Sequence, residues 1–193
     1  MRQKHNIDDI LENGIELLRE KGYNNTGVEE ILKINNIPKG SFYNFFESKE
    51  DFALKALDKY VQKQFSYIVS LLGNRSISPL ERLKKFYLEM IEFNSNEDCS
   101  KGCLLANLTQ ELGGSNPKFS DAGKKHYEKI GSLIAACIAE GQMLGEITDK
   151  FESSQLACFL HNSFNGAVLR SKAGHTTNPM VTYMDIMFEL IKK

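Results

Sequence analysis

The chain has 193 residues, enough for one large domain or two modest ones with a buried core. Its apolar fraction of 41% and charged fraction of 25% are typical of a folded protein and exclude a disordered one. With 24 Lys and Arg against 25 Asp and Glu, the net charge of −1 excludes a polybasic protein, but not a DNA reader with a small basic patch.

Apolar residues that recur at intervals of three and four predict helices along the whole chain. In chain order, the predicted helices carry apolar stripes that begin at Ile7, Val28, Phe42, Leu57, Leu80, Leu104, Phe119, Leu156 and Met180. We find no strand pattern and no repeat period between them. The sequence therefore predicts an all-α protein of about nine helices.

Capping residues predict where several of these helices start. Ser78-Pro79, Asn116-Pro117 and Asn178-Pro179 each combine a side chain that can cap the first turn with a proline, whose missing N–H this turn does not need. Ser48, with Asp51 three residues later, predicts the start of a long helix.

The spacing of the predicted helices divides the chain into two domains. Three short helices occupy the first 46 residues and precede the long one, a layout typical of a helix-turn-helix module that leads into a second domain. We place the module at residues 1–50, the long connecting helix at about 48–72 and the second domain at 75–193.

The predicted module contains a stretch free of acidic residues. From Lys33 to Phe46 it carries two lysines and no Asp or Glu. Such a stretch with a free helix N-terminus suits a phosphate group, because the backbone N–H groups and the helix dipole both point toward it. Phe42, Phe45 and Phe46 are equally typical of a plain helical core, so the pattern alone leaves both interpretations open.

A longer motif covers the same region. The stretch TGVEEILKINNIPKGSFYNFFESKEDF, Thr26 to Phe52, resembles the DNA-binding signature of TetR-type transcriptional regulators. That signature is a Thr that opens the second helix, a turn, Lys-Gly, an aromatic residue, Tyr, two variable residues, Phe, and then Ser-Lys-Glu. The resemblance covers about residues 5–60 and implies a DNA-binding domain followed by a ligand-sensing and dimerisation domain.

The resemblance implies a role for each matched residue. Thr26 would cap the second helix and contact a phosphate. The other implied DNA contacts are Lys39, Gly40 and Ser41 at the start of the recognition helix in the major groove, Tyr43 and Asn44 on backbone or base edges, and Lys49 on a phosphate. Relatives often carry His at the position of Asn44, so the base preference stays open. Arg2, Lys4 and His5 could form an arm on the DNA, although a solvated terminus is the simpler interpretation.

A dimer is expected, since one module neutralises few phosphates and would bind weakly. A two-fold dimer presents two recognition helices about 34–36 Å apart to a palindromic operator on double-stranded DNA. The resemblance implies a homodimer through the last two helices, about 154–172 and 178–192. There the small residues Ser163, Gly166, Ala167 and Ser171 would allow close approach and Met180, Met184 and Met187 would pack adaptably, unless both helices pack only within the chain.

The segment KGCLLANL, Lys101 to Leu108, resembles a TetR subgroup in which some members sense reactive electrophiles or acrylate-like compounds. At the amino end of the predicted sixth helix, the dipole would favour the reactive thiolate of Cys103, whereas a small buried Cys is the alternative. Residues that could line a largely apolar effector pocket are Cys103, Asn107, His126, Tyr127, His161, Phe164 and Asn165. Cys137 and Cys158 fall on apolar faces and are interpreted as core residues.

Metal and enzyme chemistry find little support in the sequence. Cys99 and Cys103 lie four residues apart, but no His or Cys follows at a spacing that would complete a zinc site, so we expect neither metal nor cofactor. The motifs of di-iron bundles, zincins, phosphate loops and serine hydrolases are absent, which argues against an enzyme. A helical adapter that binds only proteins is a further alternative, but it leaves the motif at residues 26–52 unexplained.

The N-terminal residues and the length of the apolar runs predict the cellular compartment. The first residues, MRQKHNIDDI, lack the apolar stretch of a signal peptide, and no apolar run approaches the roughly 18 residues that cross a bilayer. We therefore expect a cytoplasmic protein with reduced cysteines and no membrane partner. The expected function is that of a repressor released from a palindromic operator by a small-molecule or thiol-reactive effector.

Overall fold

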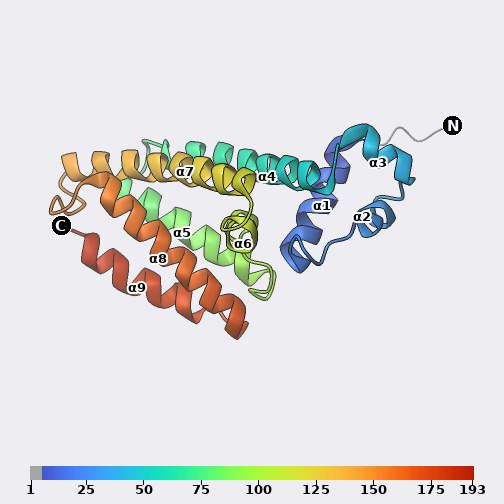
Figure 1. Ribbon diagram of the computed structural model, residues 1–193. Coiled ribbons are helices and arrows are strands. Elements are labelled where there is room, and N and C mark those ends of the chain that lie inside the picture. Colours follow the sequence, from blue (N-terminus) through green and yellow to red (C-terminus); the bar gives the residue numbers. More distant parts are fainter. Residues whose placement is uncertain (1–5) are drawn as a thin grey trace. The chain divides into compact units, whose positions relative to one another are not determined.

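The computed structural model describes residues 6–193. Arg2, Lys4 and His5, considered above as a DNA-binding arm, lie outside the described residues. Within them the chain forms nine α-helices and no regular strand, which confirms the predicted all-α class (Figure 1). The helices are α1 (Ile7–Lys21), α2 (Val28–Ile34), α3 (Lys39–Phe45), α4 (Lys49–Leu72), α5 (Pro79–Ser95), α6 (Leu104–Leu112), α7 (Pro117–Met143), α8 (Ser153–Gly174) and α9 (Asn178–Ile191).

Most of the predicted caps are confirmed. The Ser78 hydroxyl accepts a hydrogen bond from the Glu81 N–H, and the Asn116 side chain accepts one from the Lys118 N–H. Ser48 caps α4 by accepting from the Asp51 N–H at 3.1 Å, and the Asp51 carboxylate accepts in return from the Glu47 N–H at 3.0 Å. At α9 the prediction is one residue off, because Asn178 already lies in the helix and Thr177 is the N-cap.

The described chain packs as two compact units. The first consists of the residues up to Lys63 together with Cys103–Lys124, and the second of Gln64–Gly102 together with Lys125–Lys193. Both α4 and α7 contribute residues to each unit, whereas α6 belongs entirely to the first. The helix-turn-helix module therefore shares its unit with a helix from the middle of the chain.

Aromatic rings form the core of the first unit. The centroids of the Phe42, Phe46 and Phe52 rings lie 5.0–5.8 Å apart, and each residue is at most 1% exposed. Helix α1 packs so closely on this cluster that a Cβ atom at Gly14 would lie 2.1 Å from the Phe52 ring. The cluster joins α1, α3 and α4 and gives the short helix α3 a rigid support.

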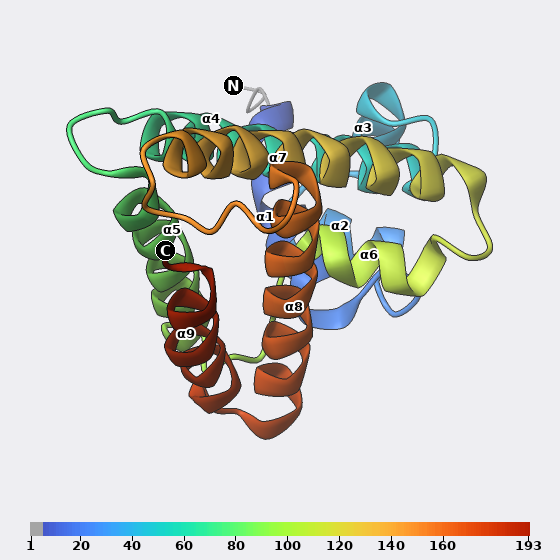
Figure 2. The ribbon, with the colours of Figure 1, turned by 90° about the vertical axis from the view of Figure 1, so that its left-hand side faces the viewer.

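The second unit has its own aromatic core, contributed by α5, α8 and α9. The Tyr87 ring lies 4.9 Å from Phe164 and 5.3 Å from Tyr183, centroid to centroid. The Tyr183 hydroxyl donates to the Leu160 carbonyl at 3.0 Å. A short connection leads from α8 to α9 (Figure 2), and the two helices pack on each other, so much of their apolar surface is buried within the chain.

Three expectations for the second unit need correction. Met180, Met184 and Met187, expected at a dimer seam, are at most 8% exposed because they face the core of their own chain. Ser171, expected on the same seam, is 1% exposed. Cys137 is buried as expected, but Cys158 is exposed, because it lies on the outer face of α8. Among the described residues, we find no helix long and apolar enough to cross a membrane.

Candidate nucleic-acid interface and effector residues

The turn between α2 and α3 is built by residues that tolerate or require a sharp reversal. Asn36 adopts a left-handed conformation with φ of 50°, which Asn accepts more readily than most residues. The Ile37 N–H donates back to the Leu32 carbonyl at 3.0 Å, and the Asn13 side-chain amide of α1 donates to the Asn35 side chain at 2.9 Å. The turn is therefore fixed both within itself and to α1.

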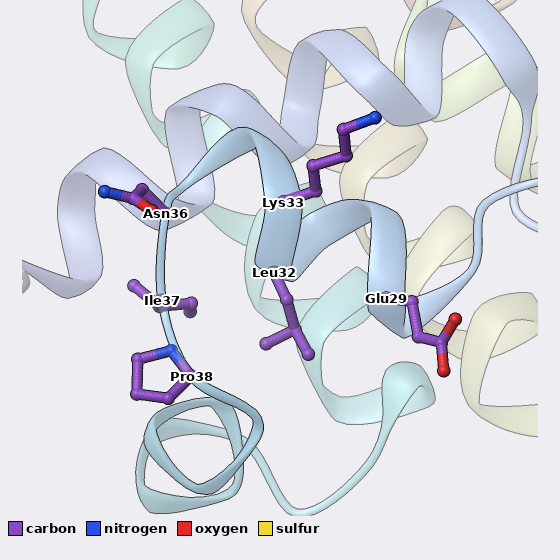
Figure 3. A pocket seen from close by; sticks show the side chains of 6 residues that line it. All are labelled: Glu29, Leu32, Lys33, Asn36, Ile37 and Pro38. Carbon is purple, nitrogen blue, oxygen red and sulfur yellow. The ribbon is translucent and has the colours of Figure 1, made fainter.

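An open hollow of about 520 Å³ borders this turn (Figure 3). In Figure 3, Lys33 extends from α2 in a different direction from Leu32, which lies near Pro38. The lining residues are Glu29, Leu32, Lys33, Asn36, Ile37 and Pro38. The hollow mixes one acidic, one basic and several apolar side chains, and we assign no ligand to it.

Helix α3 separates its side chains into two faces. Phe42 is fully buried, whereas Lys39, Gly40, Tyr43 and Asn44 are exposed. Tyr43 is 51% exposed although its ring also meets the buried Phe42 ring edge-on at 5.3 Å. The outer face of α3 thus presents a cation, a flexible hydrogen-bonding amide and a phenol on a firmly packed base.

The end of α3 is fixed as well. The Lys55 ammonium of α4 donates to the Phe45 carbonyl at 3.2 Å and pairs with the Asp51 carboxylate at 2.8 Å. One of the last backbone acceptors of α3 is thereby satisfied by a cation, which also complements the helix dipole. Both ends of α3 are held by the rest of the first unit, so its outer face is rigidly presented.

Thr26 does not play its expected part. The N-cap of α2 is Gly27, and the Thr26 hydroxyl donates instead to the Gly22 carbonyl at 2.6 Å, at the end of α1. Thr26 is 0% exposed, so it has no surface for a phosphate. The cap prediction is wrong because the loop after α1 folds the threonine inward, where it closes the C-terminal end of that helix.

Lys49 is also engaged within the chain. Its ammonium lies 4.2 Å from the centroid of the Tyr23 ring, an arrangement that favours a cation–π interaction. Partial burial lowers the pKa of Lys49, and the nearby Glu111 carboxylate opposes that shift. A phosphate contact by Lys49 would have to compete with this interaction, so that role remains a proposal.

The α6 residues named as effector candidates belong to the first unit. Cys103 is the N-cap of α6 and is partly exposed. Burial raises the pKa of the Tyr60 hydroxyl, and the neighbouring Cys103 thiol raises that pKa further. The Asn107 side-chain amide, one turn further, donates to the Arg19 carbonyl at 3.5 Å.

The other effector candidates lie in the second unit. His161 is 8% exposed, its Nδ1 has no hydrogen-bond partner among the described residues, and burial lowers its pKa to about 4. The Tyr127 ring lies 6.3 Å from it, centroid to centroid. Phe164 is a core residue packed on Tyr87, His126 is buried and Asn165 is partly exposed. The seven candidates thus divide between the two units.

The two buried cysteines and the acidic groups do not suggest further chemistry. Burial raises the pKa of the Cys99 thiol, and it raises that of Cys137 to about 11, which disfavours the reactive thiolate in both. In the part of the chain that the structure describes, no three His, Cys, Asp or Glu side chains gather as a metal ion would require.

Comparison with known proteins identifies the family to which this helix-turn-helix chain belongs. Residues 10–56 match the model for bacterial regulatory proteins of the tetR family, and residues 79–187 match that for a tetracyclin repressor-like C-terminal domain. The HTH-type transcriptional repressor DhaR of Mycobacterium sp. (strain GP1) is 31% identical, over 94% of this chain and 90% of DhaR. The chain belongs to the TetR family of transcriptional regulators.

Two further relatives agree with this assignment. The transcriptional regulator AcuR of Cereibacter sphaeroides is 33% identical, over 90% of this chain and 80% of AcuR. The crystal structure of a regulatory protein TetR from Rhodobacter sphaeroides superposes with a TM-score of 0.90 at 30% identity, over 95% of this chain and 97% of that one. The protein is therefore a DNA-binding transcriptional regulator and not an enzyme, as the sequence motif predicted.

Sequence reasoning missed two residues that organise this TetR-family regulator. Tyr60 was not singled out, although its buried hydroxyl neighbours the Cys103 thiol, which helps to raise its pKa. Glu111 was not singled out, although its carboxylate binds two backbone N–H groups of the loop after α1. Both contacts join segments far apart in the sequence, and no local pattern signals them.

Proposed function

We propose that this regulator is a homodimeric repressor that binds a palindromic operator through α3 and leaves it when a small-molecule or thiol-reactive effector acts. The observation that carries the proposal is the outer face of α3, where Lys39, Tyr43 and Asn44 are exposed on a helix whose inner face is buried. Ser41, partly exposed, and Gly40 complete the proposed DNA contacts, with Lys49 as a phosphate contact. Thr26 is not among the proposed DNA contacts, because its side chain is fully buried.

Gly40 supports the proposal by what surrounds it. A Cβ atom built there would meet no described atom within 4 Å, so packing inside the chain does not require glycine at this position. Glycine costs up to about 1 kcal/mol relative to alanine in a helix interior and less in the first turn, where Gly40 lies. An external surface that must approach the backbone closely, such as a phosphate or a base edge, gives this glycine a purpose.

The proposed dimer interface uses the outer faces of α8 and α9. Large apolar side chains are exposed there, namely Phe159, Leu169, Val181, Ile186 and Leu190. Their exposed fractions reach 66% at Leu190, an arrangement typical of helices that pack on a partner. Two copies joined through these faces would carry two α3 helices, as a palindromic operator requires.

Two kinds of effector are supported by different residues. A thiol-reactive compound would act at Cys103, because that thiol is partly exposed and lies at the N-terminus of α6, where the helix dipole favours the thiolate. Cys99 and Cys137 are buried, and the exposed Cys158 lies within α8, away from a helix N-terminus. A reversible ligand would bind in the second unit, where His161 is buried without a partner for Nδ1 and Tyr127, Phe164, His126 and Asn165 lie on the same two helices. Asn107 belongs to the first alternative by its place on α6.

Genomic SELEX with the purified protein tests the proposal, with and without prior treatment by iodoacetamide. We expect an enriched palindrome from the untreated protein. Loss of that palindrome after treatment, together with its retention in a treated Cys103→Ser variant, would support the thiol-reactive effector. Equal binding in both cases would support a reversible ligand, and failure to enrich any sequence would refute operator binding.

A further inference from the structure

The carboxylate of Glu111 holds the loop between α1 and α2. Its Oε2 accepts from the Tyr23 N–H at 2.8 Å and its Oε1 from the Asn24 N–H at 2.7 Å. Both oxygens are therefore used on consecutive backbone amides, 87 and 88 residues away in the sequence. Hydrogen bonds from backbone N–H groups to an ionised carboxylate are among the stronger ones in proteins.

The backbone conformation of the loop allows the Tyr23 and Asn24 N–H groups to donate to the Glu111 carboxylate. Gly22 ends α1 with φ of 78° and ψ of 176°, a backbone conformation that is essentially confined to glycine. A Cβ at Gly22 would also lie 2.9 Å from Glu111 Oε2, so the carboxylate packs directly on this residue. The loop and the carboxylate are matched in shape as well as in hydrogen bonding.

The rest of α6 faces the same region. Cys103, Asn107 and Glu111 are spaced by four residues and share one face of the helix. Asn107 reaches the last turn of α1 through the Arg19 carbonyl, and Glu111 reaches the loop that follows it. Helix α6 therefore contacts the end of α1 through Asn107 and the loop that leads to α2 through Glu111.

The loop passes this restraint on to the helix-turn-helix. The Tyr23 ring contacts the Lys49 ammonium, 4.2 Å from its centroid, and meets the Phe119 ring edge-on at 5.6 Å between centroids. Two residues after Asn24, the Thr26 hydroxyl donates to the Gly22 carbonyl, and α2 begins at Val28. A carboxylate on α6 is thus connected to α2 by a short, hydrogen-bonded segment.

We propose that Glu111 is a positioning residue for operator binding, which fixes the α1–α2 loop on α6 and so presents α2 and α3 to DNA in one orientation. The inference rests on the proposed function, because it needs an operator that α3 reads. Glu111 itself touches no DNA in this account. Its removal should therefore weaken operator binding without changing the preferred sequence.

The test compares Glu111→Gln with Gln110→Ala, a control at the exposed neighbouring position of α6. The glutamine keeps the size of the side chain but places an NH₂ group against one backbone N–H. Hydrogen–deuterium exchange followed by NMR would report the Tyr23 and Asn24 amides, and fluorescence anisotropy would report affinity for the SELEX palindrome. Thermal unfolding of both variants would show whether the fold is kept.

We expect exchange at Tyr23 and Asn24 to rise about tenfold or more in Glu111→Gln, with operator affinity about tenfold weaker, the same preferred sequence and an unchanged control. Faster exchange with operator affinity within twofold of wild type would overturn the positioning role, and so would unchanged exchange. Wild-type protein that binds no operator would refute the proposed function itself, a result distinct from a failure confined to the variant. Glu111→Asp, which keeps the charge, should recover part of the lost affinity.

Discussion

The outer face of α3 and the interior of the second unit hold their polar groups in opposite environments. Tyr43 on α3 is 51% exposed and its neighbours Lys39 and Asn44 are exposed too, whereas His161 is 8% exposed. The α3 face comes from one short stretch of sequence, and the interior is assembled from α5, α7, α8 and α9. Recognition of a large charged partner suits the first arrangement, and detection of a small molecule suits the second.

The difference explains what could be predicted from sequence. The helix-turn-helix is local, so its spacing and motif place Lys39, Gly40, Tyr43 and Asn44 on the same outer face of a short helix. Thr26 fails even there, because whether a loop side chain turns out to DNA or in to the Gly22 carbonyl depends on tertiary packing. Helix caps at Ser48, Ser78 and Asn116 were predictable for the same local reason.

Residues whose role depends on distant contacts could not be placed in this way. Met180, Met184 and Met187 carry a helical period, but a period alone does not tell which face meets the chain's own core and which a partner. The seven effector candidates came from polarity and resemblance, and the structure divides them between two units. Glu111 escaped notice because a charged residue near a helix end is most often simply solvated.

The largest effect on operator affinity should come from disrupting the proposed dimer, which would separate its two α3 helices. Ile186→Glu with Leu190→Glu places two charges on the exposed apolar face of α9 and should leave a folded monomer. Because both half-sites must then be bound independently, operator affinity should fall by about 100-fold or more. Sedimentation velocity and fluorescence anisotropy would measure this, with Leu88→Glu, an exposed apolar position on α5, as the control. A double variant that still dimerises would refute the proposed interface.

Substitution beneath α3, at the cluster of phenylalanine rings, should lower stability and operator affinity nearly as much. Gly14→Ala introduces a Cβ 2.1 Å from the Phe52 ring, which cannot move aside easily because Phe42 and Phe46 surround it. Overpacking of this kind costs about 1–3 kcal/mol. Urea unfolding should show that loss, and operator affinity should fall with it if the ring cluster supports α3. Unchanged stability would mean that the cluster is loosely packed.

The stability of the second unit should depend on pH through His161. His161 has its pKa lowered from 6.5 to about 4 by burial, so the folded state resists a proton that the unfolded state accepts. Stability from this group is therefore present above pH 6.5 and declines as pH falls toward 4, by about 2 kcal/mol at pH 5. Urea unfolding at pH 7 and pH 5 should show a smaller pH effect in His161→Phe than in wild type. Equal pH effects in both proteins would contradict burial of an uncharged imidazole.

The smallest effect is expected for Gly40→Ala, which distinguishes a contact with DNA from a contribution to stability. Gly40→Ala adds a methyl group where no described atom lies within 4 Å, so stability should be kept or rise by up to about 1 kcal/mol. If DNA approaches the backbone at this position, operator affinity should nevertheless fall about tenfold. Thermal unfolding and fluorescence anisotropy, measured on the same preparation, should show stability kept or raised and operator affinity lowered. Undiminished affinity would remove Gly40 from the proposed contacts.

The most direct test is the operator affinity of Lys39→Ala beside that of Lys84→Ala, which removes the same charge from an exposed position on α5. Loss of a side chain that contacts DNA costs about 1–3 kcal/mol, or roughly 10- to 100-fold in affinity. Fluorescence anisotropy at one fixed salt concentration should show that loss for Lys39→Ala only, with the dimer intact in both variants. Equal affinities for the two variants would contradict the claim that the outer face of α3 reads the operator.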